Sequence, residues 1–152
     1  MKLSEFIEKY GDCEVTDELM GMIKPKGDWK PKKGEEYYLM TTGLEIFHDT
    51  YINSEYDNNR LSKRNVYRTE EEAQFALDMY HFCKERSFEP DWENGDQDKF
   101  GLYLNHARRQ KGYWKYLDVN TFLPFYYPSK EAVQEIIDKY SFEELEKYYG
   151  RV

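Results

Sequence analysis

The chain has 152 residues, of which 39% are hydrophobic and 18% aromatic, and its formal net charge at neutral pH is −8. A chain of this length fits one domain, or two very small units that share a core. The many rings argue against a disordered chain although the mean hydropathy is −0.98. The acidic balance disfavours non-specific binding to nucleic acid or to membranes.

The N-terminal part predicts a helix followed by a basic connector. Residues 1–23 open with an amphipathic helix pattern whose apolar stripe is Leu3, Phe6, Ile7 and Tyr10. The segment lacks the apolar stretch of a signal peptide, and no apolar run reaches the ~20 residues of a membrane helix. We therefore expect a cytoplasmic protein without membrane contact. Residues 24–34 mix lysines with prolines and glycines, which exclude a regular element.

Residues 35–87 predict a first ββ(β)α unit. Aromatic and β-branched residues favour two strands, and Thr69 with Glu72 forms a capping box for the helix that follows. The expected elements are strands over 35–40 and 44–51, a polar loop over 53–64, a short strand over 65–67 and a helix over 70–86.

Residues 98–149 predict a second unit of the same kind, in which Ser129 caps the main helix. The expected elements are a loop over 88–99, strands over 100–106 and 113–118 around a basic turn over 108–112, a third strand over 122–127, a helix over 130–140 and a final helical segment over 141–149.

The two units are similar in sequence at a spacing of sixty positions. Each copy has a strand that ends in an aromatic residue, then a hydroxyl residue that caps a helix with one apolar stripe. The matching pairs include Tyr67 with Tyr127, Thr69 with Ser129, Gln74 with Gln134 and Tyr80 with Tyr140. We therefore predict an α+β fold in a single domain over 1–152, with an N-terminal helix followed by two similar antiparallel ββ(β)α units packed as one compact domain.

The main helices of the two units differ on the side away from the shared apolar stripe. The second helix is polar there, with Glu135 and Lys139, whereas the first carries Phe75, Met79 and Phe82. Monomers rarely expose such a patch. Either the N-terminal helix or the C-terminal segment covers these residues, or they contact a partner or a second copy of the chain.

Several motifs resemble those of one protein family. The run Trp29 to Tyr38 reads Trp-x-Pro-x-x-Gly-Glu-x-Tyr-Tyr. The other matching parts are 3–12, Gly43, Asp57, Arg60, 65–73, 126–132 and 144–149. Over nearly its whole length the chain resembles a family of small uncharacterised proteins encoded by phages and prophages of Gram-positive bacteria. The resemblance implies a phage accessory or early protein in the bacterial cytoplasm. Some proteins of this size and setting inhibit host defence, including anti-CRISPR proteins.

The sequence holds no motif of a metal, nucleotide or nucleophile site. His48, His81 and His106 lack the spacing of metal ligands. No glycine-rich phosphate loop and no nucleophile elbow occur. Cys83 lies on an apolar stripe and behaves as a small hydrophobic residue, and we expect it and Cys13 to be free and reduced, with a disulfide as the alternative. We therefore expect no catalytic residues, no metal and no cofactor.

A metal-dependent nuclease is one alternative to this non-enzymatic interpretation. Its candidate residues are Asp49, Glu55, Asp57 and Lys63, although acids and lysines at loose spacing are common in a chain that is 34% charged. Asp57 and Arg60 are better explained as residues that pin the loop between strands.

A nucleic-acid-binding hairpin is a second alternative. Basic residues alternate with rings in the connector around Trp29 and again over 108–116, and such patterns suit stacking on bases and contact with phosphates. The candidate residues of the hairpin are Arg108, Arg109, Lys111, Trp114 and Lys115. The competing interpretation is a solvated turn whose rings point into the core.

Acidic residues crowd both ends of the chain, and such a surface fits a basic groove that normally holds nucleic acid. Our first hypothesis is therefore a non-enzymatic phage accessory protein that binds a host protein, such as the CRISPR effector of a nucleic-acid-handling defence complex. The predicted partner-binding residues are Phe75, Met79, Phe82, Glu143, Glu144 and Glu146.

Overall fold

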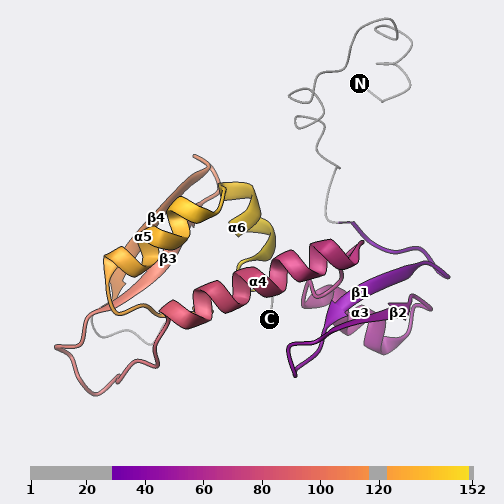
Figure 1. Ribbon diagram of the computed structural model, residues 1–152, viewed down its shortest axis with the longest axis horizontal. Helices are drawn as coiled ribbons and strands as arrows, with labels where there is room; N and C mark the ends of the chain where they lie inside the picture. The colour runs from indigo at the N-terminus through magenta and orange to yellow at the C-terminus, as the bar shows by residue number, and fades with distance from the viewer. Residues whose placement is uncertain (1–28, 117–122, 151–152) are drawn as a thin grey trace, which may run out of the picture.

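The computed structural model describes residues 29–116 and 123–150 (Figure 1). The predicted N-terminal helix, part of the basic connector and Cys13 lie outside the described residues. The described elements are β1 (Glu36–Met40), β2 (Ile46–Thr50), α3 (Glu55–Ser62), α4 (Glu70–Arg86), β3 (Lys99–Asn105), β4 (Gln110–Tyr116), α5 (Lys130–Lys139) and α6 (Phe142–Tyr148). Within this part of the chain, four helices and two antiparallel two-stranded sheets confirm the predicted α+β fold.

In the first unit, β1 and β2 form an antiparallel hairpin in which Tyr37 lies opposite Asp49. Tyr67 pairs with the other side of β1, where it exchanges two backbone hydrogen bonds of 2.9 Å with Tyr38. This isolated bridge stands where the sequence predicts a short strand. Strand β1 therefore lies between β2 and the bridging residue Tyr67, and α4 begins three residues after Tyr67.

The sequence predicts a loop over 53–64, and this prediction is wrong because α3 lies there. Ser54 caps α3: its hydroxyl accepts the backbone N–H of Asp57 at 3.1 Å, and the Asp57 carboxylate accepts the backbone N–H of Ser54 at 2.8 Å. Leu61 packs on the face of β1 that carries Tyr37. The helix is otherwise so polar that no apolar periodicity reveals it, and the capping box was the available signal.

In the second unit, β3 and β4 form a longer hairpin, and β4 begins at Gln110, within the span predicted as a turn. The described part of the predicted strand over 122–127 makes isolated bridges, of which Phe100 with Tyr127 repeats the bridge of the first unit with two 2.9 Å hydrogen bonds. Pro124 and Pro128 bracket this segment, and proline cannot donate to a ladder. The pairing is therefore short.

Helix α4 runs from one hairpin to the other and supplies both cores (Figure 1). Its first half contributes Ala73, Ala76 and Leu77 to the core of the first unit, while Met79 and Cys83 from its second half belong to the core of the second unit. A helix of 17 residues is about 25 Å long, which is enough to span both units.

Tyr148 of α6 ties the two cores together, since it packs against both of them. Its ring stacks on Tyr67 with centroids 6.4 Å apart and meets Phe75 at 5.3 Å. Its hydroxyl donates a 2.9 Å hydrogen bond to Glu72, which also pairs with Lys147. Helix α6 thus anchors the beginning of α4.

Candidate functional site

The outer face of α4 carries a shallow and largely open depression of about 410 Å³, the acidic groove. Its lining residues follow i, i+1, i+4, i+5 and i+8, which places them on one side of the helix. They are Glu70, Glu71, Gln74, Phe75 and Asp78. Three carboxylates therefore accompany one aromatic ring, and the described lining includes no lysine or arginine.

The ring of Phe75 is held in a fixed orientation by two tyrosines. It meets Tyr140 edge-on, with centroids 6.0 Å apart and planes at 86°, and Tyr148 at 5.3 Å and 60°. Phe75 is only partly buried by these contacts. The groove therefore has a rigid aromatic surface, which suits recognition because little side-chain entropy is lost on binding.

The carboxylates of the groove are not paired with cations of the described residues. Glu70 and Glu71 lie in the first turn of α4, where the helix dipole stabilises negative charge. Gln74 donates a 2.7 Å hydrogen bond to Asp78, which orients that carboxylate. Across residues 29–116 and 123–150, none of the three acids forms an ion pair. The groove thus presents a charge that suits a cationic ligand.

Glu72, beside the groove, differs from these acids because it is engaged in the fold. Thr69 caps α4 as predicted, but the Glu72 carboxylate accepts the backbone N–H of Arg68 at 2.9 Å instead of closing a box with Thr69. Burial alone would raise the pKa of Glu72, but the hydrogen bonds from Lys147, Arg68 and Tyr148 outweigh this effect and lower it. Glu72 therefore stays charged and holds α6 in place.

The C-terminal helices cover most of the apolar side of α4 that the sequence singles out. Met79 is only 1% exposed, and Phe82 packs edge-on against Tyr140 with centroids 5.7 Å apart. Met79 therefore lies in the core rather than on an exposed face. Of the three apolar residues predicted to bind a partner, Phe75 is the one that lines the groove.

The predicted acids of α6 are engaged within the molecule. Glu143 pairs with Arg109, and Glu144 accepts the backbone N–H of the residue that caps α6 at 2.8 Å. Glu146 lies 3.0 Å from Nδ1 of His106. Glu143 and Glu146 therefore connect α6 to the tip of the β3–β4 hairpin, Glu144 closes the cap of α6, and none of the three lines the groove of α4.

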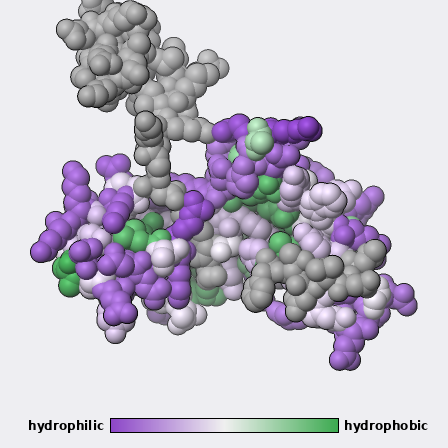
Figure 2. Space-filling model, turned by 180° about the vertical axis from the view of Figure 1, so that it is seen from behind, coloured by the Kyte–Doolittle hydropathy of each residue, from purple (hydrophilic) through white to green (hydrophobic). Residues whose placement is uncertain are grey.

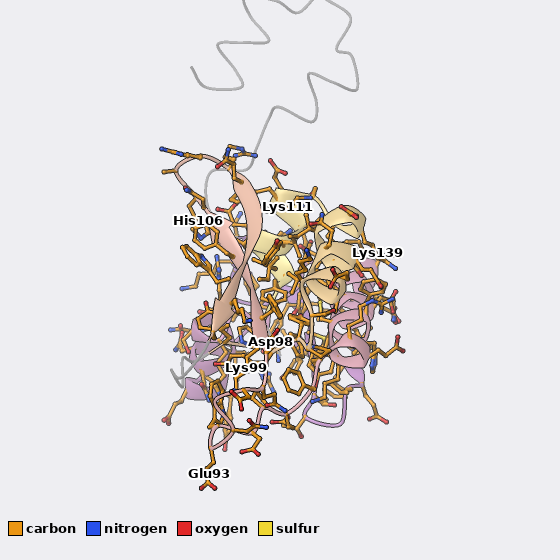
Figure 3. All side chains as sticks on the ribbon, turned by 90° about the vertical axis from the view of Figure 1, so that its left-hand side faces the viewer. Glu93, Asp98, Lys99, His106, Lys111 and Lys139 are labelled. Carbon is orange, nitrogen blue, oxygen red and sulfur yellow. The ribbon has the colours of Figure 1, made fainter. Side chains whose placement is uncertain are left out.

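The cations of the predicted nucleic-acid-binding hairpin are also engaged. Arg109 pairs with Glu143, and Lys115 lies 2.6 Å from Asp98. Lys111, labelled in Figure 3, donates two hydrogen bonds of 2.6 Å to carbonyl oxygens at the end of α5. Most of the basic charge of this hairpin thus stabilises the fold.

The rings of the hairpin point in two directions. Tyr113 packs edge-on against Phe100, with centroids 6.1 Å apart, but it is 43% exposed, so it is not the buried ring that the core interpretation expects. Trp114 instead is 56% exposed and meets Tyr103 edge-on, with ring centroids 5.7 Å apart. Arg108, in the turn before β4, is also exposed. Trp114 therefore remains accessible, in contrast to most aromatic residues of the second unit.

A buried polar network occupies the region considered for a nuclease. Tyr37 donates a 2.7 Å hydrogen bond to Asp57, and Nη1 of Arg60 donates hydrogen bonds of 2.5 Å to the Tyr37 hydroxyl and to Asp49. Asp57 also accepts the backbone N–H groups of Ile52 and Ser54. Asp57 and Arg60 therefore pin the segment after β2, as the sequence predicts.

Asp57 is 2% exposed yet remains ionised. Burial alone would raise its pKa, but hydrogen bonds from the Ser54 backbone and hydroxyl, the Tyr37 hydroxyl and the Ile52 backbone lower it to about 2. Burial raises the pKa of Tyr37 to about 12. With its oxygens occupied by these donors, Asp57 is a structural carboxylate. Among the described residues, no three His, Cys, Asp or Glu side chains are placed to hold a metal ion.

Cys83 and Lys99 are buried side chains that carry a potentially nucleophilic group. Cys83 is fully buried, as predicted, and burial raises its pKa to about 11, so that it stays a thiol. Lys99, at the start of β3, donates 3.0 Å hydrogen bonds to the carbonyl oxygens of Asn94 and Gln97, and Trp92 lies beside its ammonium (Figure 3). Lys99 thus closes the acidic loop before β3.

The sequence analysis did not single out Glu70, Glu71 and Asp78, which line the groove beside Phe75. A search for apolar stripes passes over the acids that flank one ring, although their spacing around Phe75 was a readable signal. The face shown in Figure 2 is mostly hydrophilic, with apolar side chains in small patches.

Comparison with protein-family models, with curated proteins and with solved structures finds no match to the chain. Among the described residues, no helix is both long and apolar enough to cross a lipid bilayer.

Proposed function

We propose that the protein is a non-catalytic phage accessory protein that binds a basic surface of a host protein through the acidic groove of α4. The observation that supports this most directly is the lining of the groove, with Glu70, Glu71 and Asp78 around the ring of Phe75. Carboxylates attract and orient a cationic partner, and a half-buried ring supplies the kind of contact that often dominates an interface.

A host protein that handles nucleic acid fits this groove, because it presents lysines and arginines that normally contact phosphates. The net charge of −8 would accelerate the encounter with such a partner. The resemblance to small phage and prophage proteins supports a defence complex of the bacterial cytoplasm, such as a CRISPR effector, as the partner.

Reversing the charge of the groove tests the proposal. The variant of the full chain with Glu70→Lys, Glu71→Lys and Asp78→Lys is expected to lose protection of phage or plasmid against host interference. It should also lose the host protein that the wild-type chain captures.

A matched control changes the net charge by the same amount outside the groove. It reverses three exposed acids: Glu89→Lys, Glu93→Lys and Glu131→Lys. This control is expected to retain capture and protection. Equal behaviour of the two triple variants would contradict binding through the groove.

A second candidate function, binding of single-stranded nucleic acid by the β3–β4 hairpin, is favoured by the exposure of Trp114 beside Tyr103. A mobility-shift experiment at low salt decides it. Binding that is weakened by Trp114→Ala and by Arg108→Ala supports this function, and a chain that shifts no oligonucleotide excludes it.

A further inference from the structure

Phe82 on α4 already binds cations within the molecule. The guanidinium carbon of Arg86 lies 3.5 Å from the centroid of the Phe82 ring, and Nζ of Lys139 lies 4.0 Å from it. Nε of Arg86 also contacts the Glu135 carboxylate at 2.6 Å. Ring and carboxylate together hold this arginine, by cation–π attraction and a charge-assisted hydrogen bond.

Phe75 repeats the surroundings of Phe82 two turns earlier on α4. Both rings meet Tyr140 edge-on with planes at 86°, at centroid distances of 6.0 and 5.7 Å. Each ring also has an acid three residues later on α4, Asp78 after Phe75 and Glu85 after Phe82, although the carboxylate in closest contact with Arg86 is Glu135 of α5. The aromatic part of an arginine site is therefore present twice, and at Phe75 the neighbouring acids come from α4 itself.

The two positions differ in the residue that supplies the cation. Four residues after Phe82 the helix carries Arg86, whereas four residues after Phe75 it carries Met79, which is buried in the core. In the part of the chain that the structure describes, no lysine or arginine lies over the ring of Phe75. The repeated site is therefore open toward the groove.

We infer that Phe75, with Glu71 and Asp78, binds an arginine side chain of the partner protein. This inference rests on the proposed function and names the group recognised at the same site. The planar guanidinium can stack on the ring while its N–H groups bond the carboxylates. A lysine ammonium would bind less well, because it is a compact and strongly hydrated charge.

Three synthetic peptides of one sequence measure this preference on the full chain. Each has twelve residues, and the same four positions hold arginine in the first peptide, lysine in the second and the uncharged analogue citrulline in the third. Binding is followed by the amide NMR signals of Gln74 to Asp78. We expect the arginine peptide to bind about threefold more tightly than the lysine peptide, as for a cation–π contact at an accessible site, and the citrulline peptide not to bind.

Two variants assign the preference to the site. Phe75→Leu is expected to abolish the difference between arginine and lysine, and Glu71→Gln with Asp78→Gln to weaken both peptides. Phe47→Leu serves as the control for loss of an exposed ring, and Glu89→Gln with Glu93→Gln as the control for loss of charge. If Phe75→Leu unfolds the chain, the double variant of the exposed acids decides whether the peptides bind at this site, and the comparison of the arginine and lysine peptides on the wild-type chain decides the preference.

Equal binding of the arginine and lysine peptides would overturn the inference, as would unchanged binding by the double variant. If host capture still depends on the groove in that case, the proposed function stands without an arginine preference. If the arginine preference is found but charge reversal leaves capture and protection intact, the inference stands and the host-binding proposal fails.

Discussion

At the scale of single residues, Asp57 shows how a buried charge can organise a loop. Its carboxylate accepts hydrogen bonds from Tyr37, Ser54 and the backbone of Ile52, and it lies near Arg60. A buried carboxylate with this many donors is stable as an anion, whereas removal of its charge leaves the donors unpaired. The segment between β2 and α3 therefore depends on one side chain.

Replacing Asp57 with asparagine should destabilise the fold by about 3 kcal/mol, because the amide cannot accept all these hydrogen bonds and leaves Arg60 with less opposing charge. Urea unfolding measures the loss. Glu55→Gln, on the exposed side of the same helix, is the control and should leave the unfolding midpoint unchanged. A midpoint for Asp57→Asn that equals the wild-type value would contradict this account.

The contribution of Asp57 should also depend on pH. Its pKa is lowered from the model-compound value of 3.8 to about 2 in the fold, so the unfolded chain takes up the proton first as the pH falls. The stabilisation is complete above about pH 4 and is lost as the pH falls toward about 2. The difference in unfolding free energy between wild type and Asp57→Asn should therefore shrink from pH 5 to pH 2. A constant difference would show that the charge is not the cause.

At the scale of elements, hairpins and helices are joined by polar side chains that reach across the sequence. Lys111 of β4 donates to the carbonyl oxygens of Ile137 and Tyr140 at the end of α5. These carbonyls lack partners within the helix, and a cation there also opposes the negative end of the helix dipole. The Lys111 side chain thus caps the C-terminus of α5 and also holds this helix on the β3–β4 sheet.

Replacing Lys111 with methionine should cost about 2 kcal/mol, in line with hydrogen bonds that involve a charged donor. Amide hydrogen exchange in the last turn of α5 should become faster, because that turn loses its cap. Lys130→Met, at the exposed start of the same helix, is the control. Unchanged exchange at Asp138 to Tyr140 in Lys111→Met would refute the capping role.

Local sequence patterns predicted most of the helices and strands. Thr69 and Ser129 mark the starts of α4 and α5, and the alternating aromatic residues mark both hairpins. Helix α3 escaped prediction because it buries little apolar surface of its own, so a hydrophobic period is missing. The predicted strand over 122–127 makes isolated bridges in its described part because Pro124 and Pro128 bracket it, and this signal was readable in the sequence.

The candidate site was only partly predictable. The sequence singles out Phe75 together with Met79 and Phe82, but it does not say that α5 and α6 bury Met79 and leave the ring of Phe75 accessible. Likewise, the acids of α6 and the cations of the hairpin look equally available in the sequence. Their mutual pairing, as in Arg109 with Glu143, depends on two elements meeting in space.

At the scale of the whole molecule, the two units fold around one shared helix and one closing tyrosine. Tyr148 contacts both cores, and its hydroxyl and the neighbouring Lys147 bind Glu72 at the start of α4. Such contacts between two small cores favour a single cooperative transition over two separate ones.

Replacing Tyr148 with alanine should therefore weaken the coupling between the units and cost about 3 kcal/mol through lost burial. Urea unfolding followed at Trp29 in the first unit and at Trp92 in the second, in single-tryptophan backgrounds, should give coincident curves for the otherwise wild-type chain and separated curves for Tyr148→Ala. Tyr56→Ala, at a highly exposed tyrosine, is the control. Coincident curves in Tyr148→Ala would mean that other contacts supply the coupling.

The division of α4 between two cores also imposes a helical phase on the chain. One extra residue between Leu77 and Met79 would rotate everything after it by about 100° relative to what precedes it, so the two stripes would no longer face their own cores. Seven extra residues, close to two full turns, would restore the angle but add about 10 Å between the two stripes, so that Tyr148 could no longer contact both cores. The helix therefore fixes both the angle and the distance between its two stripes.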